Sequence, residues 1–164
     1  MEVSLITNLS KEVQEIAYIQ SGVVISVLKY GNDEKMGQVF CEDDYFGLDS
    51  LIFGLNIIDY YKVGKTRFKK DSYSLFRDLL KDPNYMEQFF FNLKIIFMEI
   101  ASFMKKPEEE ILLLNLKKLH NRSQKIKGLP KEFVLTYISQ DKIQKLLSSE
   151  LITEDEELYY YNPK

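Results

Sequence analysis

The stretch YMEQFFFNLKIIFMEIASFM, from Tyr85 to Met104, sets the expectations for this 164-residue chain. Its large apolar side chains recur at alternating steps of four and three residues, the pattern of a helix with an apolar seam. Phe89, Ile96 and Phe103 add a second stripe at a spacing of seven. Either both stripes are core of one monomer, or one packs on a second copy of the chain, which we favour. The predicted dimer seam is Met86, Phe90, Leu93, Phe97, Ile100 and Met104.

Composition narrows the class of function. Apolar residues make up 45% of the chain, enough for a packed core, and the formal net charge of -3 argues against a nonspecific nucleic-acid binder. With one histidine, His120, and one cysteine, Cys41, the chain lacks the residues for a histidine-based triad, a zinc site or an internal disulfide. We expect Cys41 to be a small buried apolar residue. No residue pattern points to a catalytic site, a metal or a cofactor, so we expect a protein that is not an enzyme.

Membrane insertion and export are not expected. Glu87, Lys94 and Glu99 interrupt the apolar run of the seam helix, which is therefore a poor membrane span. The first thirteen residues contain no basic segment followed by a long apolar one, so no secretion signal is indicated. We expect a cytoplasmic protein.

The first part of the chain has the pattern of β-structure. Residues 1–63 contain short β-branched runs, including VVISVLKY from Val23 to Tyr30. Ser21-Gly22 and Gly31–Asp33 are predicted turns, because glycine and asparagine tolerate positive φ. Short strands with frequent turns indicate a small antiparallel sandwich or barrel-like roll.

The pattern then changes to helical. Asp71-Ser72 is predicted to cap a short helix over residues 73–81. Pro107 is predicted to end the seam helix and open the next one, whose first turn carries Glu108–Glu110 at the positive end of the helix dipole. Residues 151–161 have the pattern of a β-hairpin.

This order of elements resembles the Crp/Fnr family of bacterial transcription regulators. The phrase YIQSGVV, Tyr18 to Val24, resembles the family's strand–turn–strand segment, and DYFG, Asp44 to Gly47, resembles its Gly-Asp-x-hydrophobic-Gly turn without the first glycine. SQDKI, Ser139 to Ile143, resembles the start of the recognition helix, and Glu150–Ile152 resembles the phrase that leads into the wing.

The resemblance implies an α+β protein in three parts. Residues 1–82 would form an antiparallel β-roll of the cyclic-nucleotide-binding type with a short helix, and residues 83–106 a long dimerisation helix. Residues 107–164 would form a small winged-helix-like DNA-binding domain. The implied function is that of a homodimeric transcription regulator whose partners are DNA and its own second copy, with no resident cofactor.

The β-roll lacks the residues with which the family binds cyclic nucleotides. There, a Gly-Glu pair holds the ribose and an Arg-Ser/Thr-Ala step holds the phosphate, because arginine pairs bidentately with a phosphodiester. Here Leu48 follows Gly47, and Ile57, Ile58 and Asp59 occupy the later positions. We therefore predict no response to cyclic nucleotides, and the sequence names no other effector.

Two registers of the predicted helix-turn-helix are open. In the first, Pro130–Tyr137 is the first helix and Gln140–Ser149 the recognition helix, with Ser139 as N-cap. In the second, Ser139–Leu147 is the first helix, and the recognition helix runs into the acidic segment Glu154–Glu157. The second register implies a degenerate chain that dimerises and binds a ligand or protein without reading DNA. The first predicts DNA contacts by Ser139, Gln140, Lys142, Gln144 and Lys145.

Basic residues are scarce around the predicted recognition helix. From residue 125 to the end there are six lysines, no arginine and seven carboxylates, although arginine is the commonest reader of guanine. Two clusters elsewhere either help to bind phosphates or are ordinary solvated surface. One cluster is Lys117, Lys118, Arg122, Lys125 and Lys127, and the other is Lys62, Lys65, Arg67, Lys69 and Lys70.

Overall fold

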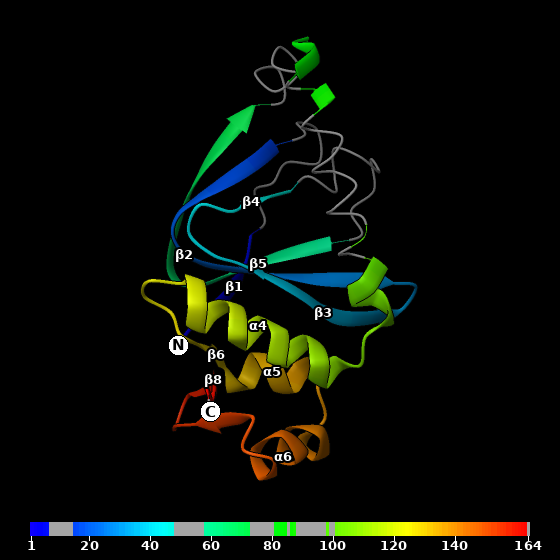
Figure 1. The fold of residues 1–164 in the computed structure, drawn as a ribbon, viewed down its shortest axis with the longest axis vertical. Helices are drawn as coiled ribbons and strands as arrows, with labels where there is room; N and C mark the ends of the chain where they lie inside the picture. Colours follow the sequence, from blue (N-terminus) through cyan, green and yellow to red (C-terminus); the bar gives the residue numbers. More distant parts are fainter. Residues whose placement is uncertain are drawn as a thin grey trace.

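The computed structural model describes residues 1–6, 15–47, 58–72, 81–84, 86–87, 98 and 101–163, and all statements below concern these residues. The fold is α+β, as expected: a large antiparallel sheet is covered on one side by α4, with the C-terminal elements beyond it (Figure 1). The strands of the large sheet are β1 (Val3–Leu5), β2 (Glu15–Tyr30), β3 (Asp33–Phe40), β4 (Tyr45–Phe46) and β5 (Ile58–Ser72). The C-terminal elements are α4 (Glu108–Arg122), β6 (Gly128–Pro130), α5 (Lys131–Tyr137), α6 (Gln140–Ser148), β7 (Ile152–Glu154) and β8 (Leu158–Tyr161).

The large sheet has the order β1-β5-β2-β3, and β4 also pairs with β2. The β2–β5 ladder runs from the pair Glu15–Ser72 to the pair Leu28–Ile58. Strand β2 is buried on both faces, since Val23, Val24 and Ile25 have no exposed surface. This explains why its sequence is a continuous apolar run rather than an alternating one.

The predicted turn at Ser21-Gly22 is wrong, because β2 continues through it. The β2–β5 register shifts on both sides of Ser21, and Gly22 has φ +95, so the glycine occupies an irregularity within the strand. A Cβ atom at Gly22 would also lie 2.5 Å from Oγ1 of Thr66. The positive φ and the close approach of β5 together account for the glycine.

The predicted end of the β-structure at residue 63 is also wrong. The helix cap predicted at Asp71-Ser72 stays a prediction, because an N-cap residue is itself extended and the helix that it would cap lies outside the described residues. Strand β5 continues to Ser72, and Asp71 and Ser72 pair with Ile16 and Glu15 of β2. Of the short helix predicted over 73–81, residues 73–80 lie outside the described residues. The lysine-rich second half of β5 has only Thr66 and Phe68 of the residue types that mark strands, and its pairing with β2 over a long sequence separation overrides this weak local signal.

Several local predictions are confirmed. Gly31 and Asn32 form a two-residue hairpin turn between β2 and β3, with φ +63 at Gly31. Pro107 directly precedes α4, whose first turn carries Glu108–Glu110. The C-terminal hairpin is formed by β7 and β8. Strand β6, which pairs with β8 to complete a three-stranded sheet, was not predicted, because three residues ending in proline give no strand signal.

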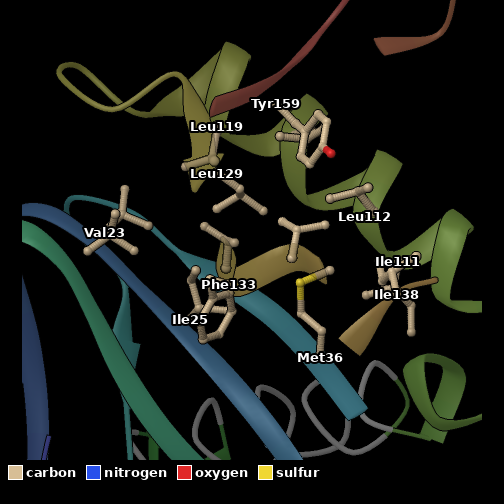
Figure 2. Close-up of a cluster of buried hydrophobic side chains, with 14 of the residues drawn as sticks. Val23, Ile25, Met36, Ile111, Leu112, Leu119, Leu129, Phe133, Ile138 and Tyr159 are labelled. Carbon is tan, nitrogen blue, oxygen red and sulfur yellow. The ribbon is translucent and has the colours of Figure 1, made fainter. Parts of the chain in front are cut away.

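One hydrophobic core joins the large sheet to the C-terminal elements. Val23, Ile25 and Met36 of the sheet pack against the apolar face of α4 and against α5 (Figure 2). The same cluster includes Ile143 of α6 and Tyr159 of β8. The C-terminal elements are therefore packed directly on the roll.

The predicted dimer seam is described only at its two ends. Met86 and Met104 are 41% and 48% exposed in the single chain. Phe90, Leu93, Phe97 and Ile100 lie outside the described residues, so the seam remains a prediction. Among the described residues, none of the helices has the length and apolar character needed to cross a membrane.

Candidate nucleic-acid interface

Helices α5 and α6 are joined by a short turn at Ile138 and Ser139. Ser139 is the N-cap residue of α6, as predicted, but its main-chain oxygen accepts from Lys142 and Ile143 while its side chain makes no capping hydrogen bond. After α6 the chain turns at Glu150, which has φ +53, and enters β7. The first of the two predicted registers is therefore the one that the fold adopts.

Helix α6 is amphipathic. Ile143 and Leu146 are buried against the rest of the C-terminal unit. The opposite face is exposed to solvent and carries four of the five residues predicted to contact DNA. They are Ser139, Gln140, Gln144 and Lys145, with the exposed carboxylate of Asp141 among them.

The fifth predicted residue, Lys142, is directed at the N-terminus of α4. Its Nζ lies 2.8 Å from Oε2 of Glu108 and 3.4 Å from Oε2 of Glu109. The hydrogen bond to Glu108 raises the pKa of Lys142, and the pKa of Glu109 is lowered by its own backbone N–H and then by Lys142. Lys142 therefore holds α6 on α4, a role that sequence spacing alone did not reveal.

The acidic tip of the β7–β8 hairpin is tied into local contacts. Glu154 pairs with Lys131 at 2.7 Å. Asp155 accepts hydrogen bonds from the backbone N–H groups of Glu157 and Leu158 and from the hydroxyl of Tyr160. The bond to Asp155 raises the pKa of Tyr160 to about 12. These carboxylates shape the turn, but they also keep it negatively charged.

The surroundings of α6 are acidic overall. From Lys131 to Glu157 there are three lysines and seven carboxylates, a formal charge of -4, and two of the lysines are paired with carboxylates. Glu108–Glu110 lie nearby at the start of α4. Besides the carboxylate of Asp141, the exposed face of α6 offers a ligand the neutral amides of Gln140 and Gln144, which suit the N6 and N7 edge of adenine, and the ammonium of Lys145.

A buried amide anchors α4 to the edge strand of the roll. Asn115, which is 1% exposed, accepts from the N–H of Val39 at 3.0 Å and donates to the carbonyl of Gly37 at 2.7 Å. Here the β2–β3 ladder shifts register between Ile25 and Val27, leaving backbone groups of β3 free for a side chain. The sequence pointed to this anchor only by placing a polar residue on the apolar face of α4.

The C-terminal end of α4 is tied to the loop after β3. Asp44 pairs with Lys118 at 3.0 Å and with Arg122 at 2.8 Å. The two oxygens of Glu42 accept from the backbone N–H groups of Gly22, at 2.9 Å, and Gln124, at 3.4 Å. Since Gly22 lies in the roll and Gln124 follows α4, this buried carboxylate links the two units.

Cys41 lies beneath this loop and is buried, as expected. Burial raises the pKa of its thiol to about 11, although the nearby cations Lys118 and Arg122 act in the opposite direction. A thiol with this pKa is almost entirely protonated at neutral pH and is a poor nucleophile. The environment therefore fits a packing role.

Helix α5 meets the roll through aromatic rings. Phe133 packs between Tyr61 of β5, at 5.4 Å between ring centroids, and Tyr137, at 5.1 Å. Burial and a hydrogen bond with Tyr61 raise the pKa of Tyr137. The first helix of the predicted DNA-reading pair is thus fixed to the sheet.

The part of the roll where the family would bind a nucleotide is described only in part. Asp59, which stands where the resemblance places a phosphate-binding residue, pairs with Lys29 of β2 at 2.6 Å. Leu48 and Ile57 lie outside the described residues. Within the described part of the chain, no three His, Cys, Asp or Glu side chains are grouped so that they could hold a metal ion.

No protein-family model and no curated protein sequence matches the chain. Solved structures do match. FixK2 from Bradyrhizobium japonicum superposes with a TM-score of 0.64 at 12% identity, over 92% of this chain and 83% of that one. A putative transcriptional regulator of the Crp/Fnr family from Eubacterium rectale gives 0.60 at 8% identity, over 99% and 85%. A CRP-family transcriptional regulator from Thermus thermophilus gives 0.59 at 12% identity, over 99% and 92%. The chain therefore has the fold of the Crp/Fnr regulators, which confirms the predicted fold class.

Proposed function

We propose that this chain is a homodimeric transcription regulator of the Crp/Fnr type that reads DNA with α6. The observation that carries the proposal is the placement of α6. It follows α5 after a short turn, lies at the outer end of the C-terminal unit and exposes Gln140, Gln144 and Lys145. This arrangement supports a helix-turn-helix in which the β7–β8 hairpin would be the wing.

The individual roles follow from the geometry of major-groove recognition. In a helix-turn-helix, the N-terminal residues of the second helix contact base edges. Ser139, Gln140 and Gln144 are placed to contact bases, with the glutamines suited to adenine, and Lys145 to contact a phosphate. Lys142 acts as a positioning residue, because its ammonium is held by Glu108 and Glu109.

Dimerisation would place two copies of α6 at a fixed separation, as two DNA half-sites require. Two methionines of the predicted seam, Met86 and Met104, are more than 40% exposed in the single chain. Covering them with a second copy would remove apolar surface from water. The substitution Phe97→Asp should give monomers or aggregates on sizing, whereas Leu114→Asp, at an exposed position of α4, should leave the elution volume unchanged.

The roll would serve as a scaffold or sense a ligand other than a cyclic nucleotide. Asp59 is engaged with Lys29, and a carboxylate at that position repels a phosphate. Calorimetry with cAMP should therefore show no binding. Micromolar affinity for cAMP would contradict this part of the proposal.

The DNA-binding proposal is tested by retention of genomic fragments and footprinting of the retained ones. We expect a two-fold symmetric footprint. Gln144→Ala should change the sequences that are selected, and Lys145→Glu should weaken binding to all of them. Lys105→Glu makes the same charge change at an exposed position near the end of the seam helix and should bind like the wild type.

A second candidate is favoured by the acidic surroundings of α6. A chain with ten carboxylates in Glu108–Glu110 and in the segment from Lys131 to Glu157 repels DNA phosphates unless other cations compensate. The alternative is a dimer that binds a protein or small ligand and no longer reads DNA. The absence of any retained fragment at about 50 mM salt would favour it over the first proposal.

A further inference from the structure

The cations that α6 lacks are found at the other end of α4. The segment from Lys117 to Lys127 contains five lysines or arginines and no carboxylate. Lys125 and Lys127 lie beyond the end of α4 at Arg122, and both are exposed. A favourable interaction with the helix dipole explains basic residues in the last turn of a helix, but not these two in the following loop.

Two further cations come from β5. Lys65 and Arg67 are both exposed, whereas Thr66 between them is partly buried, so the two cations lie on the solvent side of the strand. Nε of Arg67 donates to Oγ of Ser21 at 3.3 Å. The terminal nitrogens of this guanidinium have no partner among the described residues, so the fork that binds phosphate bidentately is available.

The two groups of cations meet at the Ser21–Gly22 segment. Arg67 contacts Ser21, while Glu42 binds the N–H of Gly22 with one oxygen and the N–H of Gln124 with the other. Lys125 is the next residue after Gln124. The loop after α4 therefore lies against the β2–β5 part of the sheet, away from the end of α4 that contacts α6 (Figure 1).

Three carboxylates near the C-terminal end of α4 are already engaged in contacts within the chain. Asp44 is bound to Lys118 and Arg122, Asp43 to the hydroxyl of Tyr18, and Glu42 to two backbone N–H groups. Lys65 and Lys125 have no partner among the described residues, and Lys127 contacts only a carbonyl, that of His120. A fourth carboxylate is that of Glu2, whose carbonyl accepts from the N–H of Gly64, the residue before Lys65. Six cations stand against these four carboxylates, which gives a formal charge of +2: Lys65, Arg67, Lys118, Arg122, Lys125 and Lys127.

We infer that Lys65, Arg67, Lys125 and Lys127 form a basic face that holds the phosphate backbone of bound DNA, separately from the reading helix. This inference rests on the proposed function. It assigns sequence readout to the neutral side chains of α6 and electrostatic affinity to the basic face. Helix α4 has 15 residues and is therefore about 22 Å long, which corresponds to about six base pairs of B-DNA. Bound DNA must therefore extend beyond the half-site that α6 contacts.

The test is the salt dependence of binding to a footprinted fragment, measured for Arg67→Glu/Lys125→Glu and for Lys105→Glu as matched control. A plot of log affinity against log salt has a negative slope, and each lost phosphate contact reduces the magnitude of that slope by about 0.9. The double variant should therefore lose about 2 in slope per protomer, and more than about tenfold in affinity at low salt. Shortening the duplex to the half-sites should lower the DNA affinity of the wild type but not that of the double variant.

The alternative outcomes are distinct. A double variant with the wild-type slope would overturn the basic face while leaving reading by α6 intact. A wild-type protein that retains no DNA at all would overturn both the inference and the proposed function. The milder pair Arg67→Gln/Lys125→Gln removes charge without reversing it, and a thermal unfolding curve for each variant verifies that the fold is intact. The variant Arg67→Gln/Lys125→Gln should also have a shallower salt dependence of DNA binding than the wild type. If this variant is folded and its salt dependence is unchanged, the basic face is contradicted.

Discussion

The two ends of α4 differ in charge and in what their charges do. At the N-terminal end, Glu108 and Glu109 are paired with Lys142 and hold α6 in place. At the C-terminal end, Asp44 pairs with both Lys118 and Arg122, and other cations remain exposed. Carboxylates at the N-terminus and cations at the C-terminus are both favoured by the helix dipole. The dipole therefore does not tell which charges hold the fold together and which could bind a ligand. The difference lies in which charges already have partners within the chain.

The comparison requires α4 to be fixed to the roll between its two ends. Asn115→Leu removes both hydrogen bonds to β3 and leaves the N–H of Val39 and the carbonyl of Gly37 buried without partners. Each such group costs about 1–3 kcal/mol, so we expect a loss of about 2–6 kcal/mol in the free energy of unfolding. Urea denaturation measures it. Asn121→Leu, at an exposed position of the same helix, is the control, and equal stability of the two variants would contradict the anchoring role.

The basic end can be strengthened by removing its internal counter-charge. Asp44→Asn keeps a side-chain oxygen for the N–H of Cys41 but releases Lys118 and Arg122. If DNA contacts this end, the variant should bind more tightly at low salt, with a salt slope steeper by about 1–2. Fluorescence anisotropy of a labelled duplex measures both. An unchanged slope in a folded variant would show that the released cations do not reach DNA.

A substitution at the acidic N-terminal end of α4 should change the stability of the fold rather than the salt dependence of DNA binding. Lys142→Met removes a partly exposed ion pair, so we expect a loss of at most about 1 kcal/mol, with faster amide exchange in α6. The salt slope of DNA binding should stay at the wild-type value. A reduced slope would instead place Lys142 among the phosphate contacts.

The effect of Lys142→Met should also depend on pH. The pKa of Glu109 is lowered below 4.5 by its own backbone N–H and then by Lys142, and the hydrogen bond to Glu108 raises the pKa of Lys142 above 10.5. The stabilisation is therefore present between these ordinary values. It is lost as the pH falls through the folded-state pKa of Glu109, or rises through that of Lys142. Urea midpoints of the wild type and Lys142→Met should converge in acid, and a constant difference would contradict the ion pair.

The smallest expected effect concerns Cys41, which lies under the basic end. Because burial dominates over the nearby cations and raises its pKa to about 11, the thiol should react very slowly with a thiol reagent at neutral pH. It should react at the rate of a free thiol after unfolding in urea. Fast reaction of the folded protein would show that the cations activate the thiol.

Local patterns predicted the parts of the fold that depend on neighbours in sequence. The turn at Gly31, the start of α4 after Pro107 and the α5–α6 pair all follow from turn, capping and periodicity signals within a few residues. The strand through Gly22 did not, because its conformation depends on Thr66 of β5. A glycine in a polar segment has the same local pattern in a turn and in a strand irregularity.

In the candidate site too, local features could be predicted from the sequence, whereas contacts between distant segments could not. The exposed residues of α6 could be predicted from helical periodicity. The partner of Lys142 could not, since Glu108 is 34 residues away and the spacing of Lys142 on α6 fits a DNA contact equally well. Likewise, the basic residues after α4 were identified as a cluster, but only the fold shows that Lys125 lies beside β5 and that Asp44 is engaged elsewhere.

The most direct test of the proposed function is the salt dependence of DNA binding by the wild-type protein. With up to five phosphate contacts per protomer, from the basic face and Lys145, log affinity should fall linearly with log salt at a slope between about -4 and -9. The fragment should remain bound at about 50 mM salt and be released as the concentration rises several-fold. No retained fragment at the lowest salt, or an affinity independent of salt, would contradict the central claim.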